Sequence, residues 1–502
     1  MSTLLATPVT VIGLGAMGRG IARAFAGHGA RVTVVDADPE ATRDGHRQTL
    51  DEAAGDGEPV ELTAAPDLAT AVAGAALVIE AVVEDMAAKK DLLATVSGAA
   101  PAEAVVATNT SSLSIGEMAR ALEAPHRFVG MHFFNPPTRM RLVELVRGAH
   151  TDDRTVALAG EWVRAVGKTP VVCGDSPNFV VNRICRPLYY EAQLLVTQGV
   201  EPATVDAVAR CALGHRMGPL QLLDFTGLHT HLASSETALR EFGEPRYRPV
   251  PLTRRLVRSG LTGRAAGRGF YDYTAEKPRA AFDRVVRTSQ EAPAGTIHLA
   301  GPGTEALLGN ERLRTARDGA AETVLYSAPV ALTDDDLAAV VRLRDSGRRV
   351  VVDSSDGRLI EDLPTGVEWL RLHARQDEPA AEVVEDTEAA IAPGAGVAAV
   401  ARAVGAVTIA VPALPGLIAD RLQHCLVNEA VLLVEEGNAS PADVDTALRL
   451  GMNHPVGPFE YLNEQGAGLV YRGVCQLLDG FGDARYRPCQ LLRRRAAGQR
   501  RQ

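Results

Sequence analysis

A glycine-rich turn close to the N-terminus is the feature that most constrains the fold of this chain. The apolar run Thr10–Ile12 predicts a strand, the pattern G-x-G-x-x-G follows it, and Met17–His28 predicts a helix. Gly13 permits the tight turn, Gly15 lets a pyrophosphate approach the backbone, and Gly18 lets helix and strand pack closely. The pattern therefore predicts an α/β Rossmann-type domain that binds a dinucleotide at the N-terminus of a helix.

An acidic residue closes the second strand of this unit. The apolar run Arg31–Val35 leads to Asp36, and a carboxylate at this place accepts hydrogen bonds from a ribose diol. Its negative charge would repel a 2'-phosphate, so NAD is the predicted cofactor rather than NADP. The alternative is a turn that merely joins strand to helix, and the strand, helix and acid around the glycines weigh against it.

Three further apolar runs predict buried strands, and each leads to polar residues. They are Ala76–Val82 before Glu84, Ala104–Ala107 before Asn109 and Ser111, and Phe128–Met131 before His132. In an open parallel sheet the loops at the carboxyl ends of the strands line the ligand crevice. These polar side chains are therefore expected to meet at the nicotinamide.

His132 and Glu144 are the predicted proton-transfer pair. Removing a hydride from a secondary alcohol requires a base for the hydroxyl proton, and histidine exchanges protons near neutral pH. Glu144 would hold the imidazole in one tautomer, and Ser111 could hydrogen-bond the reacting oxygen. Most histidines have structural roles, but His132 ends a strand at the predicted crevice. Together with the dinucleotide fold, the pair indicates a dehydrogenase.

Composition narrows the class of protein further. The 502 residues, 46% of them hydrophobic, are enough for several domain cores, and the formal net charge of −10 opposes general nucleic-acid binding. No apolar run approaches the roughly 18 residues of a membrane span. The six cysteines form no paired motif, which favours a reducing cytoplasm. No metal site is predicted.

From Val9 to about Tyr273 the chain resembles the L-3-hydroxyacyl-CoA dehydrogenases. The matching segments are Gly13–Gly18, Val78–Glu84, Asn109–Leu113, His132–Pro136 and Leu142–Glu144. The resemblance implies NAD-dependent interconversion of an L-3-hydroxyacyl-CoA and a 3-oxoacyl-CoA, with an acyl-CoA as the partner. It implies His132 as general acid/base with Glu144 beside it, and the full layout resembles the longer bacterial 3-hydroxybutyryl-CoA and 3-hydroxyadipyl-CoA dehydrogenases.

The resemblance and the strand pattern together give two sets of site residues. The expected catalytic set is His132, Glu144, Ser111 and Asn182, of which the last two would contact the substrate oxygen. The expected cofactor set is Gly13, Gly15, Met17, Gly18, Asp36, Glu84, Lys89 and Asn109.

Two departures from the family pattern bear on these expectations. Asn178 stands where the family usually has glycine, and the segment between Asp36 and Val78 is shorter by roughly a helical hairpin, which in the family helps to hold CoA. An acyl group carried by a carrier protein is therefore an alternative substrate. A non-catalytic nucleotide-binding protein of structural or regulatory role is a second alternative, and the intact catalytic set opposes it.

A helical region occurs twice in the chain. Val180–Gly199 aligns without a gap with Ile418–Gly437, and later motifs recur in the same order, so a duplication is the simplest account. The second copy has Asp420 opposite Asn182 and is predicted to be structural. In bifunctional relatives two such domains pack together, which implies either a monomer with an internal pseudo-dimer or a homodimer.

Between the copies the sequence predicts a degenerate Rossmann-like domain. Gly301 and Gly303 imitate the glycine turn, and strands are expected near Thr323–Tyr326 and Arg349–Val352. No acid follows Tyr326, and no segment resembles those of Asn109 or His132, so a scaffold is favoured over a second NAD site. The predicted domains are 1–176 (NAD-binding), 177–290 (helical), 291–403 (degenerate) and 404–502 (second helical copy).

Overall fold

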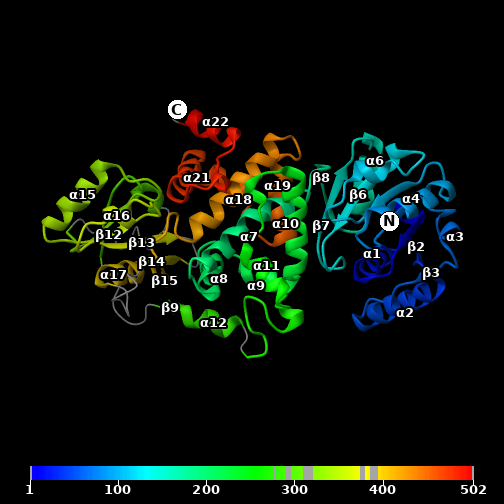
Figure 1. The fold of residues 1–502 in the computed structure, drawn as a ribbon, viewed down its shortest axis with the longest axis horizontal. Helices are drawn as coiled ribbons and strands as arrows, with labels where there is room; N and C mark the ends of the chain where they lie inside the picture. Colours follow the sequence, from blue (N-terminus) through cyan, green and yellow to red (C-terminus); the bar gives the residue numbers. More distant parts are fainter. Residues whose placement is uncertain are drawn as a thin grey trace. The chain divides into compact units, whose positions relative to one another are not determined.

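A computed structural model describes most of the chain, in the ranges 3–275, 278–288, 296–308, 320–373, 379–384 and 394–499. It divides into two compact units. The first consists of Met1–Arg183 with Leu433–Asn453, and the second of Ile184–Leu432 with His454–Gln502. Each unit contains one β-sheet with helices packed on it (Figure 1). The predicted order of an α/β region, a helical region and a second pair of the same kind is confirmed.

The sheet of the first unit has eight strands in the order β3-β2-β1-β4-β5-β6-β7-β8. Their bounds are β1 Pro8–Ile12, β2 Arg31–Val35, β3 Leu62–Ala64, β4 Leu77–Glu80, β5 Val105–Thr108, β6 Phe128–Phe133, β7 Leu142–Arg147 and β8 Thr169–Gly174. All neighbours are parallel except β6 and β7, which form an antiparallel hairpin. The crossover order around β1 is that of the predicted dinucleotide-binding sheet.

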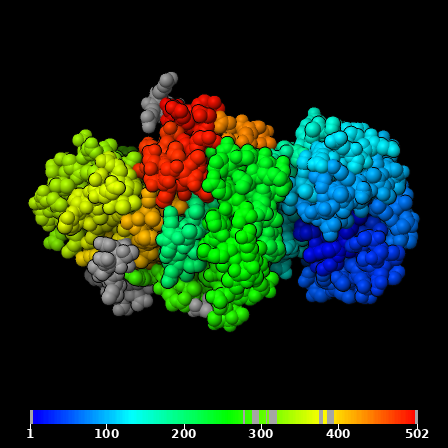
Figure 2. All heavy atoms as spheres, viewed as in Figure 1, coloured from blue at the N-terminus to red at the C-terminus, as the bar shows by residue number. Residues whose placement is uncertain are grey.

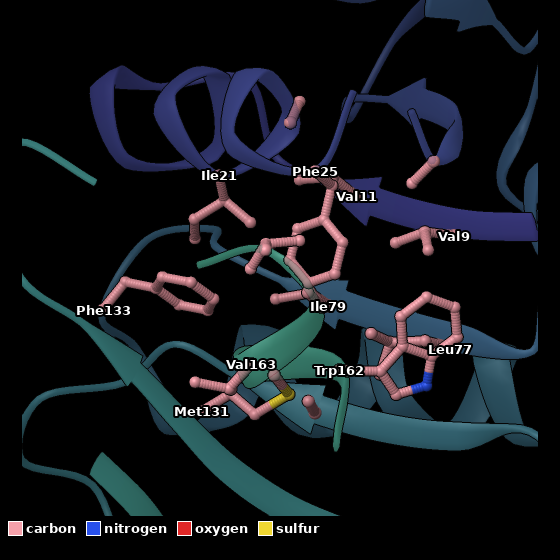
Figure 3. Close-up of a cluster of buried hydrophobic side chains, with 14 of the residues drawn as sticks. Val9, Val11, Ile21, Phe25, Leu77, Ile79, Met131, Phe133, Trp162 and Val163 are labelled. Atoms are coloured by element: carbon pink, nitrogen blue, oxygen red, sulfur yellow. The ribbon is translucent and has the colours of Figure 1, made fainter. Parts of the chain in front are cut away.

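Helices cover this sheet and close its main core. They are α1 Ala16–Ala26, α2 Pro39–Gly55, α3 Leu68–Val72, α4 Met86–Ala99, α5 Ile115–Ala119 and α6 Asp153–Ala165, with short 3-10 turns at Thr3–Ala6 and Pro125–Arg127. Figure 3 shows Phe25 of α1 and Trp162 of α6 packed over the strands. Met131 and Phe133 point into this core, so the alternation of a strand turns His132 to the opposite face. The shortened segment after Asp36 holds two helices, α2, which Asp38 caps, and the short α3, which Asp67 caps.

The second unit contains a seven-stranded sheet in the order β10-β11-β12-β13-β14-β15-β9. The strands are β9 Val286–Thr288, β10 His298–Ala300, β11 Thr323–Ser327, β12 Arg349–Asp353, β13 Glu368–His373, β14 Ala380–Val384 and β15 Val407–Val411. The helices of this layer are α13 Thr304–Leu307, α15 Asp334–Asp345, α16 Leu359–Asp362 and α17 Ala395–Val404. As in the first sheet, an antiparallel pair, here β13 with β14, interrupts a run of parallel neighbours, and β9 adds a second antiparallel pair at the edge beside β15.

One sequence comparison in this region was wrong. We compared the strand ending at Tyr326 with β2 and looked for the counterpart of Asp36 after it. In the sheet, β11 lies between β10 and β12, two places from β13. When the β13–β14 pair is matched with the β6–β7 pair, β11 becomes the counterpart of β4 and not of β2. Among the described residues, therefore, β10 forms the edge, and no strand takes the place of β2.

The helical region is duplicated as predicted. The first copy comprises α7 Val181–Thr197, α8 Pro202–Cys211, α9 Pro219–Thr226, α10 Leu228–Phe242, η3 Pro245–Tyr247, α11 Pro251–Arg258, η4 Arg264–Ala266 and α12 Pro278–Val285. The second comprises α18 Ala419–Glu435, α19 Pro441–Met452, α20 Pro458–Gln465, α21 Ala467–Phe481, η5 Ala484–Tyr486 and α22 Gln490–Gln499. The two copies pack directly against each other within the second unit (Figure 2).

The contact between the copies is reciprocal. Glu191 of the first copy accepts a hydrogen bond from the Tyr486 hydroxyl at 2.8 Å, and Glu429 of the second accepts one from the Tyr247 hydroxyl. Each copy also extends a helix to a sheet, since α19 packs on β7 and β8 of the first unit and α8 on β14 and β15 of the second. The chain thus contains an internal pseudo-dimer.

Candidate active site

The three glycines of the turn occupy three different environments. Gly13 has a φ of 90°, in the left-handed region that favours glycine. A Cβ on Gly18 would lie 1.7 Å from the carbonyl oxygen of Gly13, so any side chain there would break the packing of α1 on the turn. A Cβ on Gly15 would meet no atom within 4 Å. Gly15 therefore borders open space at the start of α1, which fits a pyrophosphate.

Asp36 is fixed beside this turn by the backbone. Its Oδ2 accepts a hydrogen bond from the N–H of Leu14 at 2.5 Å, and its Oδ1 accepts one from the N–H of Ala37 at 2.7 Å. The carboxylate thus links the end of β2 to the glycine turn. Met17, the second residue of α1, packs partly against the main core. This arrangement fits the adenosine side of an NAD molecule.

His132 and Glu144 face each other across the β6–β7 hairpin. They are direct partners in its register, and His132 Nδ1 lies 2.7 Å from Glu144 Oε2. The imidazole is 6% exposed and the carboxylate 0%. A carboxylate that accepts from Nδ1–H leaves Nε2 as the nitrogen that can take up or release a proton. The antiparallel pairing, which the sequence pattern did not reveal, is what brings the two groups together.

The second carboxylate oxygen of Glu144 is held by the segment that leads into α7. Its Oε1 accepts hydrogen bonds from the N–H groups of Val181 at 2.8 Å and Val180 at 3.2 Å. Glu144 therefore has fixed partners on both oxygens and cannot rotate away from the imidazole. Asn182 lies in the first turn of α7, directly after Val181, and so lies near this junction.

A left-handed turn positions that segment. Asn178 has a φ of 64° and Phe179 a φ of 51°. Asparagine is among the few residues that tolerate this region, which explains why it can replace the glycine of the family pattern. In the second copy the same place is held by Gly416, with a φ of 74°, ahead of Leu417.

Two aromatic rings flank the imidazole. The ring centroid of Phe134 lies 4.6 Å and that of Phe179 5.8 Å from the centroid of His132. Phe134 comes from the loop after β6 and Phe179 from the turn before α7. These rings restrict the orientation of the imidazole and exclude water from its faces.

Glu84 organises the turn that carries Ser111. Its Oε1 accepts hydrogen bonds from the Thr110 hydroxyl at 2.6 Å and from the Ser111 N–H at 3.0 Å, while the Ser111 hydroxyl lies 3.4 Å away. Asn109 of the same turn accepts from the N–H of Phe133 at 2.8 Å. The turn after β5 is thus tied to β6 beside His132.

Lys89 is buried more deeply than a residue that contacts a ligand directly needs to be. It is 1% exposed and donates to both oxygens of Glu80, at 2.9 and 2.8 Å, while Glu84 lies 3.7 Å from it. Glu80, at the end of β4, also accepts from the Thr108 hydroxyl. The sequence analysis missed Glu80, although a carboxylate inside an apolar strand, nine residues before a lysine, was a usable signal.

The second sheet contains counterparts of the catalytic positions. Glu382 of β14 accepts from the N–H of Ile418 at 2.8 Å, as Glu144 does from Val180 and Val181. Its direct partner across the ladder is Arg371. Arg371 therefore occupies the place of His132, and Glu382 that of Glu144.

The remaining positions of the constellation can be matched in the same way. The pairs, in the order first half and second half, are Asn109 with Asp353, Ser111 with Ser355, and Asn182 with Asp420. Asp353 Oδ1 accepts from the N–H of Leu372 at 2.9 Å, as Asn109 does from that of Phe133. The Ser355 hydroxyl donates to Asp420 at 2.7 Å. The sequence analysis found no such counterparts, because their residue types had changed.

These changes turn the second constellation into a buried ion cluster. The Arg371 guanidinium lies 3.0 Å from Asp420 and 3.2 Å from Asp353, and all three side chains are buried. Burial alone would lower the pKa of Arg371, but the two carboxylates raise it above its usual value. An arginine that stays protonated cannot exchange the proton of a substrate hydroxyl.

No helix in the described parts of the chain is long and apolar enough to cross a membrane. Within the same residues, no group of three or more histidine, cysteine, aspartate or glutamate side chains is placed to hold a metal ion.

The fold and the site define a nucleotide-dependent dehydrogenase, and comparison with known proteins gives its family. Residues 8–176 match the NAD-binding domain of 3-hydroxyacyl-CoA dehydrogenases, and residues 179–273 and 416–501 each match the C-terminal domain of these enzymes. The chain belongs to the 3-hydroxyacyl-CoA dehydrogenase family. It is an NAD-dependent enzyme that interconverts a 3-hydroxyacyl-CoA and a 3-oxoacyl-CoA.

Individual relatives match over the full chain or over its first half. The chain is 33% identical to 3-hydroxyadipyl-CoA dehydrogenase of Escherichia coli K12, with 97% of each protein covered. The crystal structure of 3-hydroxybutyryl-CoA dehydrogenase from Escherichia coli K12 covers 99% of both chains, with a TM-score of 0.76 and 30% identity. A probable 3-hydroxybutyryl-CoA dehydrogenase of Deinococcus radiodurans is 40% identical and aligns 99% of its length with 52% of this chain.

Proposed function

We propose that His132 is the general acid/base of an L-3-hydroxyacyl-CoA dehydrogenase and that Glu144 orients it. The observation that carries the proposal is the buried 2.7 Å contact between His132 Nδ1 and a glutamate whose other oxygen is held by two backbone N–H groups. A fixed carboxylate keeps the imidazole in one tautomer and stabilises its protonated form. The imidazole of His132 then acts as a base when the substrate is oxidised and as an acid when it is reduced.

In oxidation, His132 takes the proton of the substrate 3-hydroxyl at Nε2 while the C3–H bond breaks. The residues named below would hold NAD, which would supply the hydride acceptor for C3. Ser111 and Asn182 hydrogen-bond the reacting oxygen, a role carried over from the resemblance and supported by their places after β5 and at the start of α7. The dinucleotide is held by Gly13, Gly15, Met17, Gly18 and Asp36. On its nicotinamide side lies the turn that Glu84 and Asn109 organise, above the Glu80–Lys89 pair.

We assign the chemistry to the first half of the chain alone. The support is the replacement of His132 by Arg371 and of Asn182 by Asp420 at matched positions of the second sheet. Domain boundaries near residues 176, 290 and 403 remain part of this proposal. The second half then serves as the pseudo-symmetric partner against which the first helical copy packs, whether the chain acts as a monomer or pairs with a second one.

For the substrate we propose short 3-hydroxyacyl groups carried on CoA. The relatives that match over the full chain are named for 3-hydroxyadipyl-CoA and 3-hydroxybutyryl-CoA. No observation favours the carrier-protein alternative, because the shortened segment after Asp36 still forms a capped helix, α2, on the dinucleotide sheet. A cytoplasmic location fits the sequence, in which the six cysteines form no paired motif.

The test is NADH formation from NAD with the two enantiomers of 3-hydroxybutyryl-CoA and with 3-hydroxyadipyl-CoA. We expect turnover with the L enantiomer and at least tenfold less with the D enantiomer. NADPH formation should be slower than NADH formation. An enzyme that binds NADH but converts none of these CoA esters would contradict the proposal, and hydroxyacyl groups on carrier protein would then be tested.

A further inference from the structure

The loop that joins the two catalytic strands has a buried anchor outside the site described so far. His132 and Glu144 lie on β6 and β7, and residues 134–141, here called the hairpin loop, connect them. The position of this loop affects how the two strands that it joins are held. The contacts of the loop therefore bear directly on the 2.7 Å pair.

Lys168 is that anchor. It lies just before β8, is 8% exposed, and its Nζ donates to the carbonyl oxygens of Pro137 and of Met140, the latter at 2.7 Å. Both carbonyls belong to the hairpin loop. The adjacent backbone bond from Thr169 N–H to the Arg141 carbonyl, at 2.8 Å, fixes the end of the loop on β8.

The clamped loop also contacts the dinucleotide helix and the imidazole. A Cβ on Gly20 of α1 would lie 2.8 Å from Cδ of Pro137, so helix and loop are in close contact there. At the other end of the loop, Phe134 packs its ring 4.6 Å from that of His132. The loop thus connects α1, His132 and Glu144, and Lys168 fixes its middle.

Burial of this ammonium opposes its charge. Burial lowers the pKa of Lys168 from 10.5 to about 8. The charged residues flanking Met140, Arg139 and Arg141, are exposed. Burial is unfavourable for this lysine, and it gains only two hydrogen bonds to carbonyl groups of the loop. This indicates that the position of the loop matters.

The second sheet supplies an internal comparison. Val171 pairs with Glu144 in the first sheet, and Ile409 pairs with Glu382 in the second. Three residues earlier in the chain, just before each strand, stand Lys168 and Ala406, so the half in which arginine replaces the histidine also lacks the lysine.

From these contacts we infer that Lys168 is a positioning residue of the reaction. It holds the hairpin loop so that His132 and Glu144 keep their register and the loop keeps its contact with α1. The inference deepens the proposed role of His132 and rests on it.

The test compares Lys168→Met, Lys168→Arg and a matched surface control, Lys90→Met, in acetoacetyl-CoA reduction. We expect Lys168→Met to lower kcat at least tenfold, because a small misplacement of a catalytic pair has a large effect on rate. The stoichiometry of NADH binding, followed by its fluorescence, should stay within 20% of wild type, and its Kd within about twofold. Lys168→Arg should regain at least half of the lost kcat, and Lys90→Met should match wild type.

Retained NADH stoichiometry separates this outcome from partial unfolding, which would remove binding sites and activity together. A Lys168→Met enzyme within twofold of wild type, or an arginine variant as impaired as the methionine variant, would overturn the inference. Should Lys168→Met fail to fold, Lys168→Gln keeps an N–H donor without the charge and should show an intermediate kcat. Wild-type kcat in that variant would equally overturn it. If His132→Gln loses all turnover while Lys168→Met has normal turnover, the proposed function stands and only this inference is overturned.

Discussion

Arg371 lies directly across the β13–β14 ladder from Glu382, in the register in which a histidine faces a glutamate in the first sheet. The second half of the chain therefore has the same hairpin geometry, with an arginine at the place of the histidine that we propose to move the proton. Its carboxylate still binds the segment that leads into a helix, α18. The retained contact joins the sheet to the helical copy.

The ion cluster around Arg371 should contribute to the stability of the second unit. Arg371→Met leaves Asp353 and Asp420 buried without their cation, which typically costs about 3–5 kcal/mol. We expect a lower thermal midpoint in calorimetry, with the kcat of the folded enzyme at 25 °C within about twofold of wild type. The double variant with Asp420→Asn should recover part of the loss. An unchanged midpoint in Arg371→Met would contradict a structural role for the cluster.

Asp36 should set the preference for NADH over NADPH. Its carboxylate is fixed on the N–H groups of Leu14 and Ala37, so its charge stays beside the ribose site. Asp36→Asn keeps the shape and removes the charge, and the ratio of kcat/KM for the two cofactors should fall at least tenfold, about 1.4 kcal/mol. Asp44→Asn on α2, whose side chain is half-exposed, is the control. The same ratio in Asp36→Asn and wild type would show that another group selects the cofactor.

The adjacent rings of His215 and His454 should make the stability of the second unit sensitive to acid. Their ring centroids lie 4.4 Å apart, and burial together with the neighbouring ring holds the pKa of His454 well below its usual 6.5. The unfolded chain binds a proton at this histidine below pH 6.5 and the folded chain does not, so stability falls as pH drops below that value.

Urea unfolding at pH 7.5 and 5.5 checks this expectation. The midpoint of wild type should fall between the two pH values by more than that of His454→Asn. An exposed control, His150→Asn, should behave as wild type. Equal pH dependence in wild type and His454→Asn would mean that other groups, such as buried His231, account for the acid sensitivity.

The parts of the site that follow from local sequence were predictable, and those that depend on pairing were not. The glycine turn and Asp36 follow from the geometry of one strand, one turn and one helix, so their spacing along the chain is informative. The antiparallel register that opposes His132 to Glu144 depends on how β6 and β7 align, which spacing does not reveal. The hydrogen bonds from the N–H groups of Val180 and Val181 to Glu144 join residues that lie 36 and 37 positions apart. No local sequence pattern indicates them.

In the second half of the chain, the sequence reveals even less about the paired positions. An arginine in place of a histidine, and an aspartate in place of an asparagine, carry no motif that a sequence search would match. Only the shared register and the shared backbone bonds reveal Arg371 and Asp353 as counterparts of His132 and Asn109. Lys168 was missed for a related reason, since a single lysine before a strand is uninformative until its two carbonyl partners are seen.

We propose that His132 moves the proton and that the second half of the chain adds no turnover. NADH consumption with acetoacetyl-CoA, measured for wild type, His132→Gln and the exposed control His150→Gln at equal concentrations of NADH-binding sites, checks both points. We expect His132→Gln to bind NADH normally and to lose turnover by roughly a hundredfold or more, while His150→Gln matches wild type. A His132→Gln enzyme that retains more than a tenth of wild-type turnover would contradict the proposal.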